Sequence, residues 1–212
     1  MASQVRGSES GNSGGHPLRG DDLSYQQALG LLSEYLPPGE EAHEHCLCVS
    51  QVAERIALAA KEKVALDLEF VRTSALLHDI GRALTHDGTF HCWEGYLLMT
   101  RLDAPRHARV CMAHGYAGLS GEEASLLGLP AEDFRPRTWE EKIVTLADGL
   151  VEGNQVVDHR QRVRRVYERY RAKGADRVML KMIEAIEGKI EDLIEEVERL
   201  TQRPIEEILQ FV

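Results

Sequence analysis

Apolar residues recur at helical spacing along most of this chain, and no alternating apolar and polar run typical of a strand appears. The segment 42–63 illustrates the pattern with apolar residues on one helix face, at Val49, Val52, Ala53, Ile56 and Ala60. Aromatic residues make up only 6% of the 212 residues, and helix formers dominate. The sequence therefore predicts an all-α fold that is long enough to bury one substantial core.

Composition divides the chain into three parts. Residues 1–20 are rich in Gly and Ser and nearly free of large apolar residues, which predicts a disordered tail. Residues 21–155 predict a core of helices, several of which start at capping-box pairs: Ser24 with Gln27, Ser120 with Glu123, and Thr138 with Glu141. Residues 156–212 predict an extension of long charged helices that break near Gly174 and Pro204.

Charge and hydropathy limit the partners and the location of the protein. The net charge of -10 argues against a general nucleic-acid or membrane coat. No stretch approaches the roughly 18 apolar residues that a membrane span requires, and no apolar signal core opens the chain. We therefore expect a cytoplasmic protein with no membrane partner.

One basic segment, HRQRVRRVYERYRAKG at 159–174, stands out from this acidic chain. Its arginines, with Tyr167 and Tyr170 between them, are typical of a solvated helix face. They also suit contact with a polyphosphate or an RNA backbone, so nucleic acid stays open as a less favoured partner.

From Asp176 onward, an apolar stripe runs along a Glu-rich helix: Met179, Met182, Ile183, Ile186, Ile190, Leu193, Ile194, Val197 and Leu200. This stripe predicts either packing on the domain or pairing with a second chain. Length and amphipathicity leave both alternatives open, so a homodimer remains one expectation.

The four cysteines are expected to be reduced and to fill space in the core: Cys46, Cys48, Cys92 and Cys111. Cys46 and Cys48 lie two positions apart on a predicted helix, so they point to different faces. They make a poor pair for binding a metal.

His45 lies on the apolar face of the 42–63 helix, in register with Val49 and Val52. A histidine at such a position needs a hydrogen bond, an ionic partner or a metal. Taken alone, His45 is more typical of a hydrogen-bonded core histidine.

An apolar helix at 67–77 leads directly into His78 and Asp79, and Gly81 follows, where it can supply a turn. Burying a lone carboxylate beside this helix costs several kcal/mol, so Asp79 needs a compensating charge. A divalent cation supplies that charge, and a salt bridge to Arg82 is the alternative.

Asp148 lies within TWEEKIVTLADGLVEG, on a helix whose face is otherwise apolar. No basic residue lies three or four positions away to pair with it. A structural role and a ligand role both remain open for this single residue.

Together, His45, the pair His78 and Asp79, and Asp148 follow the ligand order of the HD-domain metal-dependent phosphohydrolases, which this sequence resembles. The element LLHDIGR resembles the HDIG branch of that superfamily. HCLCVSQVAERIA and TWEEKIVTLADGLVEG resemble the helices that carry the first His and the last Asp, and the similarity covers most of 42–153. The resemblance implies an HD-domain helical bundle followed by additional C-terminal helices.

The resemblance also implies a set of ligands for a first metal: His45, His78, Asp79 and Asp148. Asp79 would bridge to a second metal, for which His91 and His114 are the implied ligands. His86 and His107 compete for that assignment, because the sequence does not show which imidazoles converge. Two metals are favoured over one.

Imidazole and carboxylate ligands suit Mn, Fe, Zn, Co or Ni, whereas Mg is less favoured by ligand type. Coordination lowers the pKa of water, which makes hydroxide available near neutral pH. Asp79, or another acidic residue, is expected to handle a proton in catalysis. Arg82 is expected either to clamp a phosphate oxygen or to form a salt bridge at the helix end, and His86 and Lys142 are weaker substrate-binding candidates.

The expected function is therefore metal-dependent hydrolysis of a phosphate ester, in a nucleotide or another small phosphorylated metabolite. One alternative is a phosphodiesterase that acts on a cyclic nucleotide or an RNA end. The other is a module that senses a nucleotide through its metal site without turnover.

Overall fold

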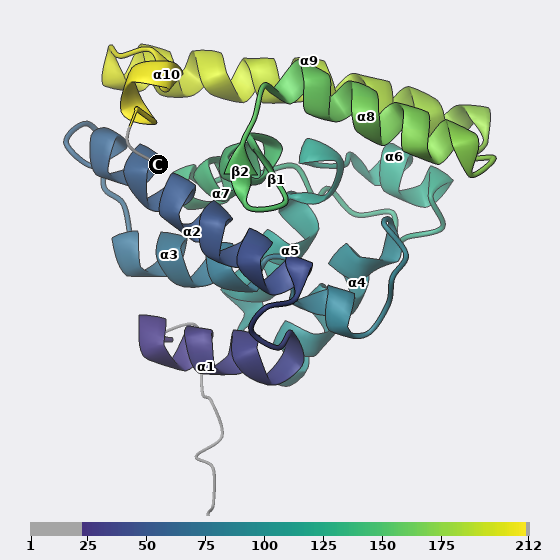
Figure 1. Ribbon diagram of the computed structural model, residues 1–212, viewed down its shortest axis with the longest axis horizontal. Helices are drawn as coiled ribbons and strands as arrows, with labels where there is room; N and C mark the ends of the chain where they lie inside the picture. The colour runs from purple at the N-terminus through teal and green to yellow at the C-terminus, as the bar shows by residue number, and fades with distance from the viewer. Residues whose placement is uncertain (1–22, 211–212) are drawn as a thin grey trace, which may run out of the picture.

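The computed structural model describes residues 23–210, and these form an almost entirely helical bundle (Figure 1). Its α-helices are α1 Tyr25–Tyr35, α2 Glu41–Ala60, α3 Leu68–Leu77, α4 Phe90–Arg101, α5 Pro105–Ala113, α6 Gly121–Leu126, α7 Trp139–Gly149, α8 His159–Ala172, α9 Arg177–Thr201 and α10 Ile205–Ile208. Shorter elements join them, namely the 3-10 helices η1 Ile80–Ala83 and η2 Gly115–Ala117 and the antiparallel strands β1 Val151–Glu152 and β2 Gln155–Val156. The predicted all-α class is confirmed, whereas the predicted tail at 1–20 lies outside the described residues.

Side-chain caps start several helices where the sequence predicts them. Ser24 and Ser120 each form the reciprocal capping box, which satisfies backbone groups at the first turns of α1 and α6. Thr138 caps α7 by accepting a hydrogen bond from the Glu141 backbone, but the Glu141 carboxylate binds the Arg109 side chain instead of closing the box. The predicted start of α7 is therefore correct, but only one of the two hydrogen bonds of the expected capping box forms.

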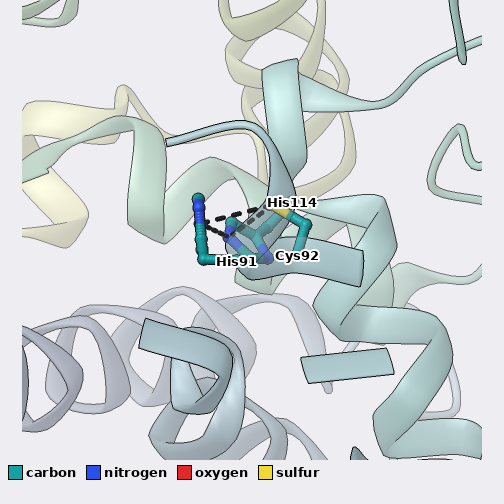
Figure 2. Close-up of side chains that lie close together, drawn as sticks. All are labelled: His91, Cys92 and His114. Carbon is teal, nitrogen blue, oxygen red and sulfur yellow. Dashed lines mark hydrogen bonds between the residues drawn. The ribbon is translucent and has the colours of Figure 1, made fainter. Parts of the chain in front are cut away.

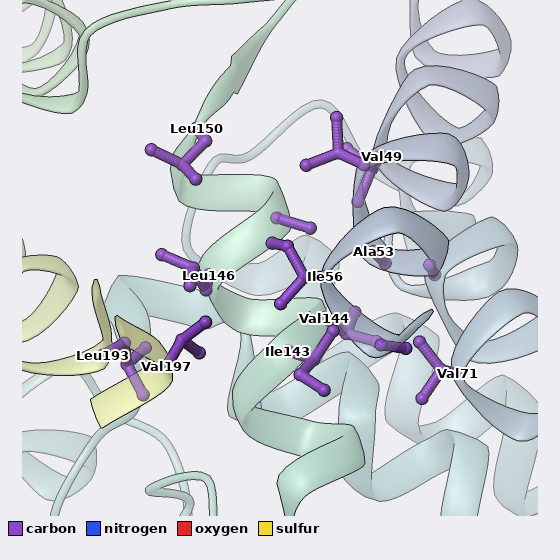
Figure 3. Close-up of a cluster of buried hydrophobic side chains, with 14 of the residues drawn as sticks. Val49, Ala53, Ile56, Val71, Ile143, Val144, Leu146, Leu150, Leu193 and Val197 are labelled. Carbon is purple, nitrogen blue, oxygen red and sulfur yellow. The ribbon is translucent and has the colours of Figure 1, made fainter. Parts of the chain in front are cut away.

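The main hydrophobic core lies between α2, α3, α7 and α9 (Figure 3). Its members include Val49, Ala53, Ile56, Val71, Ile143, Val144, Leu146, Leu150, Leu193 and Val197. Complete burial of an aliphatic side chain of this size contributes about 1.5–3 kcal/mol. The helices α2 and α7, which carry His45 and Asp148, and α3, which ends at His78, thus share one core.

The C-terminal helices pack onto this core rather than standing apart from it. In Figure 1, α9 crosses the bundle next to α8, and its residues Ile190, Leu193 and Val197 are buried in the same cluster as α2 and α7. The apolar stripe of α9 therefore has its partner within the chain. Neither this helix nor any other in residues 23–210 has the apolar length that a membrane crossing requires.

Gly81 lies in the turn that the sequence predicts, the 3-10 helix η1, and it also serves close packing. Its φ is not in the left-handed region, but a Cβ at this position would lie 2.0 Å from the carbonyl oxygen of His91 and 2.4 Å from the Gly95 nitrogen. Only glycine therefore lets η1 lie directly against α4. This contact brings the chain around Asp79 next to the helix that carries His91.

Candidate metal centre

The first set of converging donor atoms comes from the C-terminal end of α3 and from the helices α2 and α7. His45 Nε2 lies 3.1 Å from Asp148 Oδ1 and 4.0 Å from Asp79 Oδ2. His78 Nε2 lies 3.8 Å from the same Asp148 oxygen and 4.0 Å from the same Asp79 oxygen. Four residues from three separate parts of the chain thus present one nitrogen or oxygen each to a common point.

The second set shares Asp79 through its other oxygen. Asp79 Oδ1 lies 2.9 Å from His91 Nε2 and 3.3 Å from His114 Nε2, and these two nitrogens are 3.3 Å apart. The imidazoles come from α4 and from the residue that follows α5. Asp79 therefore has one oxygen in each set, as a carboxylate that bridges two ions would.

The two competing histidines lie outside these sets. His86 is exposed on the loop between η1 and α4, where it lines the cavity described below. His107 is buried in α5, where its Nε2 shares a hydrogen bond of 3.1 Å with Thr73 Oγ1. Of the four imidazoles that compete for the second metal, the structure brings His91 and His114 together.

Each clustered imidazole is oriented by a backbone carbonyl that faces its Nδ1. The pairs are His45 with Gly153 at 3.0 Å, His78 with Ala75 at 2.7 Å, His91 with Asp87 at 3.3 Å, and His114 with Val110 at 3.4 Å. When Nδ1 donates its proton in this way, the Nε2 lone pair is free to bind a metal. The short β1–β2 hairpin, which the sequence did not predict, supplies the Gly153 carbonyl.

Buried polar atoms fit the presence of a cation. His78 Nε2 is buried and has no hydrogen-bond partner within residues 23–210, and Asp79 Oδ1 is buried with the His91 and His114 imidazoles beside it. An unpartnered buried polar atom costs free energy, which a bound divalent cation would recover. The donor set of imidazole nitrogens and carboxylate oxygens is also one that transition metals prefer.

The electrostatics keep Asp79, His78 and Asp148 in the protonation states that metal ligands need, whereas Cys92 and Asp79 outweigh burial and raise the pKa of His91 to about 9 and that of His114 above its ordinary value. Burial opposes the charge of Asp79, but Arg82, His91 and His78 outweigh burial and hold the pKa of that carboxyl well below its ordinary value. Burial lowers the pKa of His78 to about 4, so its imidazole is neutral near pH 7. For Asp148, burial again opposes ionisation, and the nearby Arg162 guanidinium overcomes it and lowers the pKa.

Three basic residues differ in their relation to the centre. Arg82 donates from Nε to Asp79 Oδ2 and lines the cavity, a position that suits both roles expected for it. Lys142 does not line the cavity, because its ammonium pairs with Glu196 of α9, so its placement gives no support to substrate binding. Arg162 donates from Nη2 to Asp148 Oδ1 at 3.1 Å.

Sequence reasoning missed Arg162 because it looked for a partner three or four positions away. The actual partner of Asp148 lies fourteen residues along, on α8. The only sequence signal for this pair was the basic segment 159–174. No rule based on sequence spacing says which acidic residue such a segment will contact.

Cys92 corrects the expectation that all cysteines only fill space. All four are free and buried. Cys92 Sγ, however, lies 3.3 Å from His91 Nε2 and 3.6 Å from His114 Nε2. Figure 2 shows the three side chains close together. Burial raises the pKa of this thiol, but the two imidazoles outweigh burial and lower the pKa to about 6, whereas burial raises the pKa of Cys111.

A cavity of about 720 Å³ opens onto both sets of donor atoms. His45, Asp79, His91, His114 and Asp148 lie along its wall. The loop at 85–88 and α8 form other parts of that wall. The centre is therefore accessible to a ligand larger than water.

Comparison of the sequence with known proteins identifies a family and several relatives. The family model described as HD domain matches residues 42–152, which is more than half of the chain. An uncharacterized protein of Methanocaldococcus jannaschii is 36% identical over 174 residues, which cover 81% of this chain and 99% of that protein.

Two further relatives are larger proteins named tRNA (cytidine(56)-2'-O)-methyltransferase. Those of Picrophilus torridus and Thermoplasma volcanium are 31% and 34% identical over 62% and 71% of this chain, and the matches span only 41% and 42% of the two proteins. No solved structure matches at a comparable level. By the extent of the family match and by the centre that its residues form, this chain belongs to the HD-domain family.

Proposed function

We propose that this protein is a metal-dependent phosphohydrolase that cleaves a phosphate ester of a nucleotide or another small phosphorylated metabolite. The observation that carries this proposal is the opening of one cavity onto both donor sets. Its volume of about 720 Å³ falls within the range of about 300–1,000 Å³ that is common for small-molecule sites.

Metal binding would use the two sets through the bridging Asp79. His45, His78 and Asp148 complete one set, and His91 and His114 complete the other. When bound, divalent cations at such sites lower the pKa of water and neutralise charge on phosphoryl oxygens. The donors suit Mn, Fe, Zn, Co or Ni better than Mg.

Arg82 would position the phosphate. Its Nε binds Asp79, which fixes the guanidinium at the cavity wall. The terminal nitrogens of an arginine held in this way match the geometry of a phosphate oxygen pair. Arg82 thus combines both expected roles, a salt bridge on one edge of the guanidinium and a phosphate clamp on the other.

The α8 wall supports a nucleotide-sized substrate rather than a bare phosphate. It brings Arg162, Arg169 and Lys173 to the cavity together with the apolar Val166 and the aromatic Tyr170. The cationic groups suit additional phosphates, whereas Tyr170 and Val166 suit the base or sugar.

Release of phosphate or nucleotide from a panel of nucleotides, sugar phosphates and dinucleoside polyphosphates, with Mn²⁺ or Fe²⁺ added, tests the proposal. We expect one substrate group to be turned over, and we expect Asp79→Asn to lose that activity by more than about 100-fold. Replacing a residue that only orients a metal ligand typically costs up to about 100-fold, so a larger loss fits a direct ligand. Lys142→Ala is the matched control and should retain it. A protein that binds metal but turns over no member of the panel would favour the nucleotide-sensing alternative.

A phosphodiesterase acting on a cyclic nucleotide or an RNA end is the second candidate. Two observations favour it: basic residues of α8 line the cavity, and two relatives carry the name of a tRNA-modifying enzyme. Under this reading, an RNA ending in a cyclic phosphate is the better substrate, and Arg169→Glu at the α8 wall of the cavity weakens RNA binding. Equal RNA binding by wild type and Arg169→Glu would remove an RNA end as the substrate.

A further inference from the structure

His91, Cys92 and His114 form a compact cluster that the expected His and Asp ligands do not fully describe (Figure 2). Their closest donor atoms are separated by 3.3 Å between the two Nε2 atoms, 3.3 Å between Cys92 Sγ and His91 Nε2, and 3.6 Å between Cys92 Sγ and His114 Nε2. All three side chains are buried. The three donor atoms are therefore nearly equidistant from one another, at 3.3–3.6 Å.

These separations match those of ligands around one tetrahedral ion. With metal–nitrogen bonds of about 2.05 Å and a metal–sulfur bond of about 2.3 Å, tetrahedral geometry places two nitrogens about 3.3 Å apart and nitrogen and sulfur about 3.6 Å apart. The three measured distances agree with these values to within about 0.3 Å. Asp79 Oδ1, at 2.9 Å and 3.3 Å from the two imidazole nitrogens, lies where a fourth donor is needed.

The surrounding chain leaves room for the sulfur and keeps it dry. A Cβ on Gly115, the residue after His114, would lie 2.7 Å from Cys92 Sγ. On its other side, Cys92 belongs to an apolar cluster with Met112, Leu119 and Phe134. A thiolate in such surroundings needs a positive partner, because burying an isolated charge is costly.

The other cysteines provide the comparison. Cys111 Sγ donates to the Leu77 carbonyl, as a buried thiol commonly does, and Cys48 packs in the main core. The described residues thus hold space-filling thiols elsewhere, whereas Cys92 is the cysteine that forms a metal-capable group with two imidazoles.

We propose that Cys92 is a thiolate ligand of the metal held by His91 and His114, and that this site takes Zn²⁺, or Co²⁺ as its spectroscopic substitute, in preference to Mn²⁺ or Mg²⁺. A thiolate is a soft ligand, and Mn²⁺ and Mg²⁺ prefer oxygen donors. The set built on His45, His78 and Asp148 has no sulfur, so the two sites of one chain differ in metal preference. This inference concerns metal binding and does not depend on the reaction or its substrate.

Cobalt spectroscopy of the full-length protein tests the proposal directly. Metal-free protein is titrated with Co²⁺, and a thiolate-to-cobalt charge-transfer absorption in the near ultraviolet is recorded. We expect this absorption in wild type and in the control Cys48→Ser, and its loss in Cys92→Ser. Wild-type protein that binds two equivalents of Co²⁺ without the absorption would overturn the proposal, and that result needs no variant to fold.

Competition between metals gives the second readout. Metal content after dialysis against equal Zn²⁺ and Mn²⁺ is measured by elemental analysis. We expect Cys92→Ser to lose at least about tenfold in Zn²⁺ affinity at one of two sites, with the other unchanged. Unchanged Zn²⁺ affinity at both sites of a Cys92→Ser protein with wild-type circular dichroism would show that the sulfur is not a ligand. Because neither readout uses substrate, failure of the hydrolase proposal would leave both results interpretable.

Discussion

Arg162 of α8 donates from Nη2 to Oδ1 of Asp148 on α7 at 3.1 Å. Both side chains are largely buried, with 20% and 13% of their surface exposed. The same Asp148 oxygen lies 3.1 Å from His45 Nε2, so α8 shares a carboxylate with the metal centre. Residues far beyond the HD motif therefore take part in the electrostatics of the site.

Replacing Arg162 by alanine should destabilise the metal-free protein more than the metal-loaded protein. Without the guanidinium, the buried Asp148 carboxylate loses a partner, at a cost of about 1–3 kcal/mol. A bound cation supplies a compensating charge, so the loss should shrink when metal is present. Chemical unfolding with and without a chelator measures both values, and Arg164→Ala, an exposed neighbour on α8, is the control. Equal losses in the two conditions would contradict this account.

Gly81→Ala should lower the free energy of unfolding by about 1–3 kcal/mol, because the new methyl group would overlap backbone atoms of His91 and Gly95. The shift of α4 should also weaken metal binding at His91. The opposite effect is expected for Gly188→Ala in α9, where the added Cβ meets nothing within 4 Å and alanine favours the helix by about 1 kcal/mol. Thermal unfolding of both variants checks the contrast, and similar behaviour of the two would refute it.

His91→Ala should remove one equivalent of bound metal, because the second donor set loses an imidazole while the first set stays complete. Elemental analysis of the purified variant gives the stoichiometry. His86→Ala is the matched control, since His86 is exposed and lies outside both sets. Unchanged stoichiometry in His91→Ala would remove His91 from the ligands.

Arg82→Ala and Lys142→Ala should separate the two basic residues that the sequence put forward. We expect Arg82→Ala to retain metal and to lose about 100-fold or more in kcat/KM, as removal of a group that stabilises transition-state charge does. Lys142→Ala should keep kcat/KM and lose less than about 1 kcal/mol of stability, the usual value of a partly exposed ion pair. A large loss of kcat/KM in Lys142→Ala would instead support a role for Lys142 in substrate binding.

Local sequence patterns were sufficient for the starts of several helices, and the resemblance to a known family supplied the candidate donor residues. Helical periodicity and capping residues act over a few positions, so the starts of α1, α6 and α7 follow from the chain itself. The order of His45, His78, Asp79 and Asp148 identified the family because these residue types carry the chemistry. None of this required knowledge of which helices touch.

The tertiary structure decided which side chains meet. Cys92 joins His91 and His114 because α4 and α5 pack together, and η1 approaches α4 only because Gly81 lacks a side chain. Likewise, α8 and α9 supply Arg162 to Asp148 and Glu196 to Lys142. Such pairings depend on how helices distant in sequence pack against a common core. Sequence spacing determines which face of a helix is buried, but the residues that this face meets are set by packing among several helices at once.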